Sequence, residues 1–184
     1  MKPIRLFLSD VDGCMTDGGM YYSAQGDELK RFNVYDGMGM LLLQQHGVKC
    51  GILTSETTPI VLNRARKLGL DYLYMGVGRQ KDHGSVVRHA PASAEGQTLP
   101  FRTKLDASRD ICRELGIGLD EVCYVGDDIN DIDLLREAGT AACPANAVAQ
   151  VKSIEGIIML GRNGGDGVLR ELADKLIAGG KMPI

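Results

Sequence analysis

The sequence predicts a doubly wound α/β fold, in which helices cover both faces of a parallel sheet. Short apolar runs alternate with segments of helical periodicity along most of the chain, the order of repeated βαβ units. The first run, residues 4–8, is apolar except for Arg5, which is typical of a buried parallel strand. Two helical segments are followed by Gly47 and Gly69, which are good helix stops. We therefore expect a three-layer α/β/α sandwich.

Short apolar segments define the expected strands. The expected core strands are residues 4–8, 48–54, 72–75, 121–125, 141–143 and 157–160. Residues 18–22 and 28–34 are expected to pair as a protruding β-hairpin, because residues 23–27 between them are rich in turn formers. The hairpin as a whole spans residues 18–34.

Helices are expected between these strands, where apolar residues recur at helical spacing. The expected helices are residues 38–45, 59–68, 104–115, 132–138, 147–151 and 168–178. Residues 78–102 break the rhythm, because they are polar and rich in Gly, Pro and Ala. This inserted segment is expected to be a surface loop, with a partial lid over the site as the alternative. Its histidines, His83 and His89, lack a common metal-site spacing.

Length and composition narrow the class of protein. A chain of 184 residues is expected to form one domain, residues 1–184, and its net charge of −3 argues against nucleic acid as a partner. No apolar run approaches the length of a membrane span. The five cysteines are scattered and form no Cys-x-x-Cys pair, so neither a disulfide framework nor a zinc site is expected. The first strand begins too early to leave room for a signal peptide. Together these features predict a cytoplasmic protein.

Two carboxylates at the end of the first strand are the strongest functional signal. Asp10 and Asp12 stand two residues apart in the sequence Asp10-Val11-Asp12-Gly13, so alternation along an extended chain points them the same way. Such a pair repels itself unless it shares a cation or a proton. Taken alone, this motif is often only a turn. A calcium-binding EF-hand loop is excluded, because Cys14 and Met15 occupy positions that need polar ligands and glycine.

Other polar residues follow the neighbouring strands, whose carboxyl ends share one edge of the sheet. Thr54 ends the second core strand, and residues 126–128, with Asp127, end the fourth. Lys104 opens the helix after the insertion and is favoured over Lys81 for binding phosphate because of that position. Asp10 and Asp127 suit Mg²⁺, while Thr54 and Lys104 suit phosphate oxygens. The set predicts phosphoryl transfer, with a carboxylate nucleophile that forms an acyl phosphate.

Four motifs in order resemble those of the haloacid-dehalogenase superfamily of phosphatases. They are residues 10–13, Thr54, Lys104 and residues 126–131. Residues 16–22, 32–37 and 164–171 are similar to the cap-less sugar-acid phosphatase branch. That branch includes the 3-deoxy-manno-octulosonate 8-phosphate phosphatases and the keto-deoxy-nonulosonate 9-phosphate phosphatases. The resemblance covers the whole chain except residues 78–102, and it implies a Rossmann-like fold without a cap domain.

The resemblance also implies roles for individual residues. Asp10 would be the nucleophile and an Mg²⁺ ligand. Asp12 would protonate the leaving sugar oxygen and then activate water, while its backbone carbonyl binds the metal. Asp127 would be the third protein ligand, and Asp128 and Asp131 would support the metal-bound waters.

Binding roles and assembly follow from the same resemblance. Thr54 and Lys104 would hold the transferring phosphoryl group. Cap-less members form homotetramers, so the hairpin would meet its copies centrally and a neighbouring subunit would close each site. Asn33, Asp36 and Gly37 fall where the family contacts substrate. Residues 164–167 are either a helix-entry loop or a tail segment that reaches an active site.

Departures from the octulosonate pattern bear on the substrate. Those enzymes carry Thr-Gly-Arg and Asn-Val-Arg-Asp, whereas this chain has Ser55-Glu56 after Thr54 and Tyr35 before Asp36. Two arginines are therefore missing, and arginine is the natural bidentate partner of a sugar carboxylate. The residues of this chain look more like those of the nonulosonate enzymes, so a nine-carbon sugar acid is favoured.

The same comparison assigns further substrate contacts and leaves alternatives. Ser55 would contact the substrate, and Glu56 would accept hydrogen bonds from sugar hydroxyls. Arg64 or Lys67 would pair with the substrate carboxylate. The alternative is that Glu56, Arg64 and Lys67 form only ion pairs on the helix surface. Octulosonate 8-phosphate is the alternative substrate. A non-catalytic oligomerisation module, related to domains fused to cytidylyltransferases, is the alternative of another class. Such a module would have no physical reason to keep the four catalytic motifs together.

Overall fold

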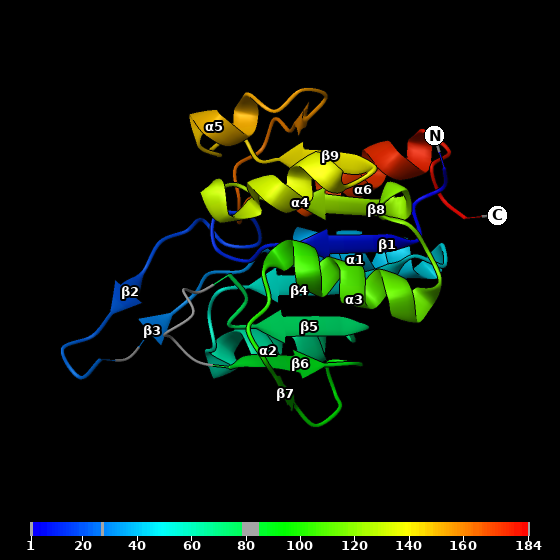
Figure 1. The fold of residues 1–184 in the computed structure, drawn as a ribbon. Helices are drawn as coiled ribbons and strands as arrows, with labels where there is room; N and C mark the ends of the chain where they lie inside the picture. Colours follow the sequence, from blue (N-terminus) through cyan, green and yellow to red (C-terminus); the bar gives the residue numbers. More distant parts are fainter. Residues whose placement is uncertain (1, 27, 79–84, 184) are drawn as a thin grey trace.

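The computed structural model describes residues 2–26, 28–78 and 85–183, and it has the expected α/β class. Eight strands form one sheet in the order β10-β9-β8-β1-β4-β5-β6-β7 (Figure 1). The parallel strands are β1 (Leu6–Ser9), β4 (Lys49–Thr54), β5 (Tyr72–Met75), β8 (Val122–Val125), β9 (Thr140–Cys143) and β10 (Ile158–Met159). The two strands β6 (Val86–His89) and β7 (Gln97–Leu99) add an antiparallel edge.

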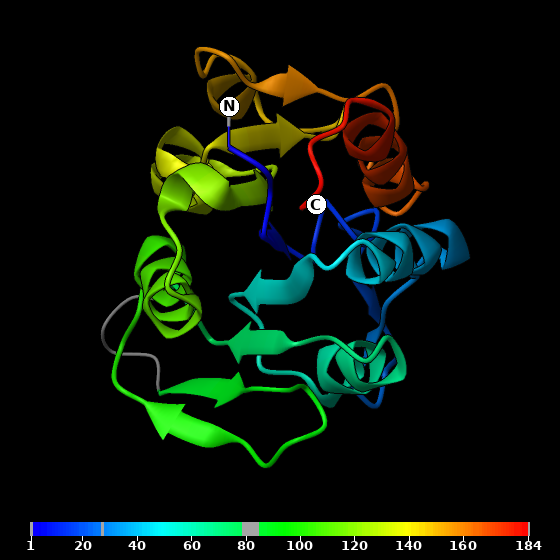
Figure 2. The same ribbon diagram turned by 90° about the vertical axis from the view of Figure 1, so that its right-hand side faces the viewer.

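Helices cover both faces of the sheet and complete the three layers (Figure 2). One face carries α1 (Val34–Gln45), α2 (Pro59–Lys67) and α6 (Val168–Ala178), and the other carries α3 (Lys104–Leu115), α4 (Ile132–Glu137) and α5 (Ala149–Lys152). Alternation along β1 feeds both cores, because Phe7 packs with the first set of helices while Leu6 and Leu8 pack with the second. The central strand is thus buried on both sides.

The central strand β1 also marks the point where the chain changes direction across the sheet. It pairs with β4 on one side and with β8 on the other, so that Leu8 lies opposite both Gly51 and Tyr124. In open α/β sheets such a switch point leaves a crevice beyond the carboxyl ends of the strands. The candidate carboxylates follow β1 directly.

Local capping explains why several helix boundaries agree with the sequence analysis. The Thr58 side chain accepts a hydrogen bond from the backbone of Ile60 before Pro59 opens α2. Thr103 and Asp106 form a capping box at the start of α3. Helix α3 ends at Gly116, whose φ of 63° is left-handed and suits glycine. These signals are local, so the sequence alone reveals them.

The start of α1 corrects one prediction. The expected strand of residues 28–34 is only β3 (Glu28–Leu29), which pairs with β2 (Tyr21–Tyr22) in a hairpin that extends away from the main sheet (Figure 1). The helix expected from residue 38 begins four residues earlier, at Val34. The reason is Asn33, whose side chain accepts a hydrogen bond from the Tyr35 backbone and caps the helix.

The inserted segment also differs from its prediction. The expected surface loop of residues 78–102 is wrong for β6 and β7, which extend the main sheet. Strand β6 pairs with β5 and places Leu73 opposite His89, which is 4 % exposed and whose Nδ1 lies 2.8 Å from the Ala94 carbonyl oxygen. The polar composition of this segment led to the prediction of a loop, although two of its stretches form strands at the edge of the sheet. Lys81 and His83 lie outside the described residues.

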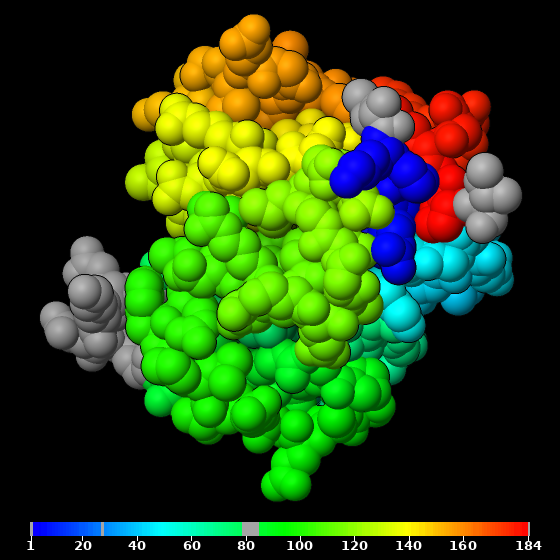
Figure 3. Space-filling model, turned by 45° about the vertical axis from the view of Figure 1, so that its right-hand side comes forward, coloured from blue at the N-terminus to red at the C-terminus, as the bar shows by residue number. Residues whose placement is uncertain are grey.

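The two ends of the described chain lie together on one side of the molecule. The first residues run beside the C-terminal segment (Figure 3), and the Ile4 backbone N–H donates to the Lys181 carbonyl oxygen at 2.8 Å. Within residues 2–26, 28–78 and 85–183, none of the helices combines the length and hydrophobicity that crossing a membrane requires.

Candidate active site

A crevice of about 170 Å³ opens at the carboxyl ends of β1, β4 and β8. Its lining residues are Asp10, Asp12, Thr54, Ser55, Glu56, Asp127, Asp128 and Asn130. They come from loops far apart in the sequence, which the parallel sheet brings to one edge. The crevice therefore contains residues that follow each of the three strands to which the sequence analysis assigned site residues. Lys104 is buried and contacts Asp10.

The loop after β1 is shaped by two requirements. The Asp10 backbone N–H donates to the Val125 carbonyl oxygen at 2.9 Å, which continues the sheet beyond β1, and Asp10 Oδ1 accepts from the Val11 backbone at 2.7 Å. The chain then turns at Gly13, whose φ is 82°. A Cβ at Gly13 would lie 2.0 Å from Asp127 Oδ2. Glycine at this position lets the two carboxylate-bearing loops approach each other.

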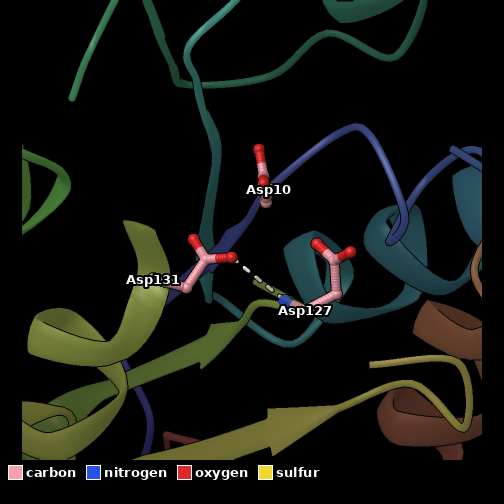
Figure 4. A group of neighbouring side chains, drawn as sticks. All are labelled: Asp10, Asp127 and Asp131. Carbon is pink, nitrogen blue, oxygen red and sulfur yellow. Dashed lines mark hydrogen bonds between the residues drawn. The ribbon is translucent and has the colours of Figure 1, made fainter. Parts of the chain in front are cut away.

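Three aspartates form a cluster that can hold a cation. The carboxylates of Asp10, Asp127 and Asp131 offer oxygens that all lie within 4.8 Å of one another (Figure 4). Burial raises the pKa of Asp10 to about 7, with Lys104 opposing the shift and Asp131 adding to it. Burial followed by the charges of Asp10 and Asp131 raises the pKa of Asp127 to about 7. Clustered hard oxygens whose charges repel one another fit Mg²⁺.

Asp131 differs from the other two because the protein itself satisfies it. Its Oδ1 accepts from Lys104 Nζ at 2.6 Å and from the Tyr124 hydroxyl, and its Oδ2 accepts from the backbones of Asp127 and Asp128 at 3.0 and 3.2 Å. Burial raises the pKa of Tyr124, so that its hydroxyl remains a donor. Asp131 is therefore placed to orient Lys104 and the loop of Asp127.

Lys104 is a buried cation beside Asp10. It is the first residue of α3 and is 1 % exposed, and its Nζ lies 2.8 Å from Asp10 Oδ2. Burial by itself lowers the pKa of this ammonium, but the charges and hydrogen bonds of Asp10 and Asp131 outweigh burial and raise it. A lysine held between two carboxylates stays protonated, and an anionic substrate can share its charge.

The end of β4 supplies hydroxyl groups. Thr54 Oγ1 accepts from the Glu56 backbone N–H at 3.1 Å. Ser55 Oγ donates to the Val77 carbonyl oxygen at 2.9 Å and accepts from Asn130 Nδ2 at 3.2 Å. These contacts fix the loop of β4 against the loop of β8 and keep both at the crevice.

Three residues near these carboxylates, Lys30, Thr16 and Tyr124, were given no role by the sequence analysis. Lys30, beside the hairpin strand β3, donates from Nζ to Asp12 Oδ1 at 2.7 Å, and Thr16 Oγ1 lies 3.3 Å from the same oxygen. Tyr124 lies in an apolar strand, and the one feature of the sequence that could have indicated its role is its hydroxyl group close to residues 126–128. Lys30 carried no signal, because its contact depends on how the hairpin folds back.

Several predicted substrate contacts lie away from the crevice. The Asp36 carboxylate is buried and accepts from the backbones of Gly167 and Leu169 at 3.3 and 2.8 Å, so it caps α6. Asn33 caps α1 and also donates to the Gly165 carbonyl oxygen at 3.3 Å. A Cβ at Gly37 would lie 2.8 Å from Leu68 Cδ2, so this glycine permits helix packing.

The two cations predicted for the substrate carboxylate also lie elsewhere. Arg64 donates to the Asn33 carbonyl oxygen at 2.9 Å, and its guanidinium carbon lies 5.3 Å from the centroid of the Phe32 ring. Lys67 is exposed near the end of α2. Neither residue lines the crevice of its own chain, so a role in binding would need another subunit.

The glycine-rich loop before α6 supports the catalytic loop from behind. The Gly165 backbone donates to the Cys14 carbonyl oxygen at 2.9 Å, and a Cβ at Gly164 would lie 1.9 Å from the Gly13 carbonyl oxygen. Asn146 joins the two loops, because its Nδ2 donates to the Gly13 carbonyl oxygen while its Oδ1 accepts from Gly164. These contacts lie within one chain, so the loop that leads into α6 also packs against the loop after β1.

Fold and site together define an α/β enzyme with an acidic crevice, able to hold a metal ion, at its topological switch point. The family model of haloacid dehalogenase-like hydrolases matches residues 30–139. This range includes Thr54, Lys104 and Asp127. The chain belongs to the haloacid dehalogenase-like hydrolase family, as the resemblance in the sequence analysis implied.

Relatives of known name cover nearly the whole chain. The 3-deoxy-D-manno-octulosonate 8-phosphate phosphatase of Escherichia coli K12 is 30 % identical over 184 residues, covering 97 % of this chain and 82 % of the relative. The enzyme of the same name from Haemophilus influenzae is 28 % identical, covering 96 % of this chain and 84 % of the relative.

A solved structure supports the same relationship. The Moraxella catarrhalis 3-deoxy-D-manno-octulosonate 8-phosphate phosphatase, in complex with magnesium, phosphate and KDO, superposes with a TM-score of 0.78 at 30 % identity. The match covers 95 % of this chain and 86 % of that one. A relative of this identity and coverage supports likeness of fold and of chemical class.

Proposed function

We propose that this protein is an Mg²⁺-dependent phosphoric monoester hydrolase that acts on the phosphate ester of a 2-keto-3-deoxy sugar acid. The carrying observation is that Asp10, Asp12, Thr54 and Asp127 line one crevice while Lys104 contacts Asp10 from the buried side. The names of the relatives support phosphatase chemistry. The non-catalytic alternative has no use for a buried lysine held between two carboxylates.

The metal ligands in this proposal are the carboxylates of Asp10 and Asp127 and the backbone carbonyl of Asp12. A bound Mg²⁺ neutralises negative charge on the phosphoryl group and on the carboxylates around it. Asp128 and Asp131 would support waters on the bound ion. Asp131 does so through its hold on the loop of Asp127, since the Asp127 backbone donates to its carboxylate.

The chain's own residues carry the two chemical steps. The Asp10 carboxylate attacks phosphorus in line and forms an aspartyl phosphate, while Asp12 donates a proton to the departing sugar oxygen. Asp12 then takes a proton from a water molecule that attacks the aspartyl phosphate, which releases phosphate and restores Asp10. Lys104 and Thr54 hold the phosphoryl oxygens in both steps.

The size of the crevice sets where the sugar lies. About 170 Å³ accommodates a phosphoryl group beside a cation, whereas small-molecule sites usually occupy about 300–1,000 Å³. The sugar therefore extends beyond the crevice of a single chain. A neighbouring subunit is the natural source of the missing walls.

Exposed apolar side chains support a homotetramer as part of the proposal. Large exposed hydrophobic residues gather on the hairpin and on α1: Met20, Tyr21, Tyr22, Leu29, Val34, Tyr35, Met38 and Leu41. Exposed large apolar side chains gathered on two neighbouring segments of the chain are typical of a protein interface. The hairpin of residues 18–34 would lie at the centre of the assembly, and Arg64 and Lys67 would then serve the site of a neighbour.

The choice of sugar rests on fewer residues. Ser55 and Glu56 line the crevice at the positions where Thr-Gly-Arg would place glycine and arginine. Glu56 in place of that arginine favours a nine-carbon nonulosonate 9-phosphate, with Glu56 on its hydroxyls. Octulosonate 8-phosphate is the second candidate, and the names of the relatives support it. Cytoplasmic localisation belongs to the same proposal and is supported by five cysteines that are all free and buried.

Phosphate release with Mg²⁺ tests the proposal. The panel contains a nonulosonate 9-phosphate, octulosonate 8-phosphate and a hexose phosphate, assayed with the wild type and with Asp10→Asn. We expect turnover of a sugar-acid phosphate, and a loss of more than about 10³-fold in the variant, because the nucleophile is removed. Preference for octulosonate would reverse the choice of sugar alone. Phosphate release by Asp10→Asn at the wild-type rate would refute the nucleophile assignment. Absence of phosphate release by the wild type from every substrate of the panel would refute the proposed function.

A further inference from the structure

We propose that Lys30 is a positioning residue for Asp12, the general acid and base of the reaction, and that it ties this carboxylate to the hairpin. The inference rests on the proposed function for the role of Asp12 and goes beyond it in assigning Lys30. The carrying observation is the contact between Lys30 Nζ and Asp12 Oδ1 at 2.7 Å, within one chain.

Lys30 is held from two sides. Its Nζ lies 3.0 Å from Glu28 Oε1 and 3.9 Å from the sulfur of Met20, in addition to its contact with Asp12. The Lys30 side chain is 0 % exposed, so its ammonium has exchanged water for these partners. Burial lowers the pKa of Lys30, but its contacts with the carboxylates of Asp12 and Glu28 outweigh burial and raise it. Lys30 is therefore a fixed cation.

The contacts on Asp12 are one-sided. Both described hydrogen bonds, from Lys30 Nζ and from Thr16 Oγ1 at 3.3 Å, go to Oδ1. Charge-assisted hydrogen bonds are the stronger ones, so the ammonium holds Oδ1 in place and leaves Oδ2 to face a reacting group. Asp12 Oδ2 is then the atom that gives the proton to the departing sugar oxygen and later takes one from water. Lys30 sets which oxygen performs the transfer without itself touching the phosphoryl group.

Because Lys30 lies next to β3, its contact with Asp12 links this carboxylate to the hairpin. Glu28 belongs to β3, and the hairpin carries the exposed apolar residues of the proposed interface. Orientation of the acid and base thus depends on a segment outside the sheet. The nucleophile and Lys104, by contrast, are fixed by the sheet and by α3.

A structural experiment tests the assignment independently of turnover. Crystals of the wild type and of Lys30→Met, both grown with Mg²⁺, are compared at Asp12. We expect the wild-type carboxylate to keep Oδ1 toward Lys30 and the variant carboxylate to rotate or to adopt several orientations. An Asp12 side chain that keeps its wild-type orientation in the variant would overturn the proposal. This readout stands even if no phosphate ester is turned over.

Single-turnover kinetics tests the same point in function. The substrates are the best sugar phosphate of the panel and p-nitrophenyl phosphate, whose leaving group needs no proton. We expect Lys30→Met to slow phosphoryl transfer from the sugar phosphate by about 10- to 100-fold and from p-nitrophenyl phosphate far less. Lys30→Arg should recover most of the loss. Equal losses on both substrates would contradict a role through Asp12.

A double-mutant cycle separates positioning from general damage to the hairpin. In the Asp12→Asn background, Lys30→Met should cause no further loss, because the two residues act as a unit. An additional loss of the full single-mutant size would refute the proposal. The matched control is Lys49→Met, which removes a lysine that also pairs with an aspartate, Asp71, at 2.7 Å, but at the amino end of β4. It should keep the wild-type rate.

Discussion

The crevice and the hairpin are built by opposite rules. At the crevice, Asp10, Lys104 and Asp131 are almost completely buried, and Lys104 at the start of α3 pairs with both carboxylates. On the hairpin, Tyr22 is 62 % and Leu29 is 69 % exposed, and among the described residues two pairs form the β2–β3 ladder. The difference teaches that the reacting groups are preorganised within one chain, whereas the surroundings of the sugar are left to an exposed segment and its partners.

The largest expected effect breaks the buried side of this comparison. Lys104→Met should lower the rate of phosphate release by at least about 10²-fold, because a positioned cation on the developing charge is lost. It also leaves Asp10 and Asp131 without their shared partner, so the melting temperature should shift as well. Steady-state kinetics and thermal unfolding of the same preparation check both. Activity within a factor of about three of the wild type would remove Lys104 from the site.

A smaller effect is expected when the exposed side is broken. Leu29→Asp places a charge on the apolar hairpin surface, so the assembly should dissociate while the fold of the single chain persists. Light scattering should show a lower mass, and kcat/KM for the sugar phosphate should fall by about 10-fold. Glu155→Asp, a conservative change at an exposed residue distant from the hairpin, serves as the control. An unchanged mass would remove the hairpin from the interface.

The mildest test sharpens the comparison through pH and metal. Since Asp10 and Asp127 have a pKa of about 7 in the fold against an ordinary value of 3.8, the folded chain binds more protons than the unfolded chain between these values. Without metal, stability should therefore fall as pH rises from about 4 to about 7. Mg²⁺ replaces those protons, so its stabilising effect should grow over the same range.

Melting temperatures with and without Mg²⁺ check this dependence. We expect the gain from the metal to be larger by about 5 °C at pH 8 than at pH 5. The same measurement on Asp127→Asn should show a weaker dependence on pH, because one of the two carboxylates is gone. A gain from Mg²⁺ that is independent of pH would contradict the role of these carboxylates as its ligands.

The sequence predicts those parts of the fold whose signals are local. Helix α3 is predicted to the residue because Thr103, Asp106 and Gly116 mark its ends. Helix α1 is missed at its start because Asn33 and Val34 also suit a strand, and only the cap decides. Strands β6 and β7 are missed because their side chains are largely polar and their pairing with β5 is set by tertiary contact.

The site divides along the same line. Asp10, Thr54 and Asp127 could be placed together from sequence because each follows a parallel strand, and such ends share one edge. Asp36 could not be placed, because its role depends on the start of α6, more than a hundred residues away in the sequence. The contact between Lys30 and Asp12 has the same origin, since the hairpin must fold back before the two meet.

The small crevice has an evolutionary consequence. The crevice of about 170 Å³ has room for little more than a phosphoryl group and a cation. All phosphate esters share the phosphoryl group, so the buried residues need not change when the sugar changes. New sugars can be accommodated by substitutions on the hairpin and on α2, where side chains are exposed and exchange costs little stability. Related enzymes can therefore change their substrate specificity while they keep the same catalytic residues and the same reaction.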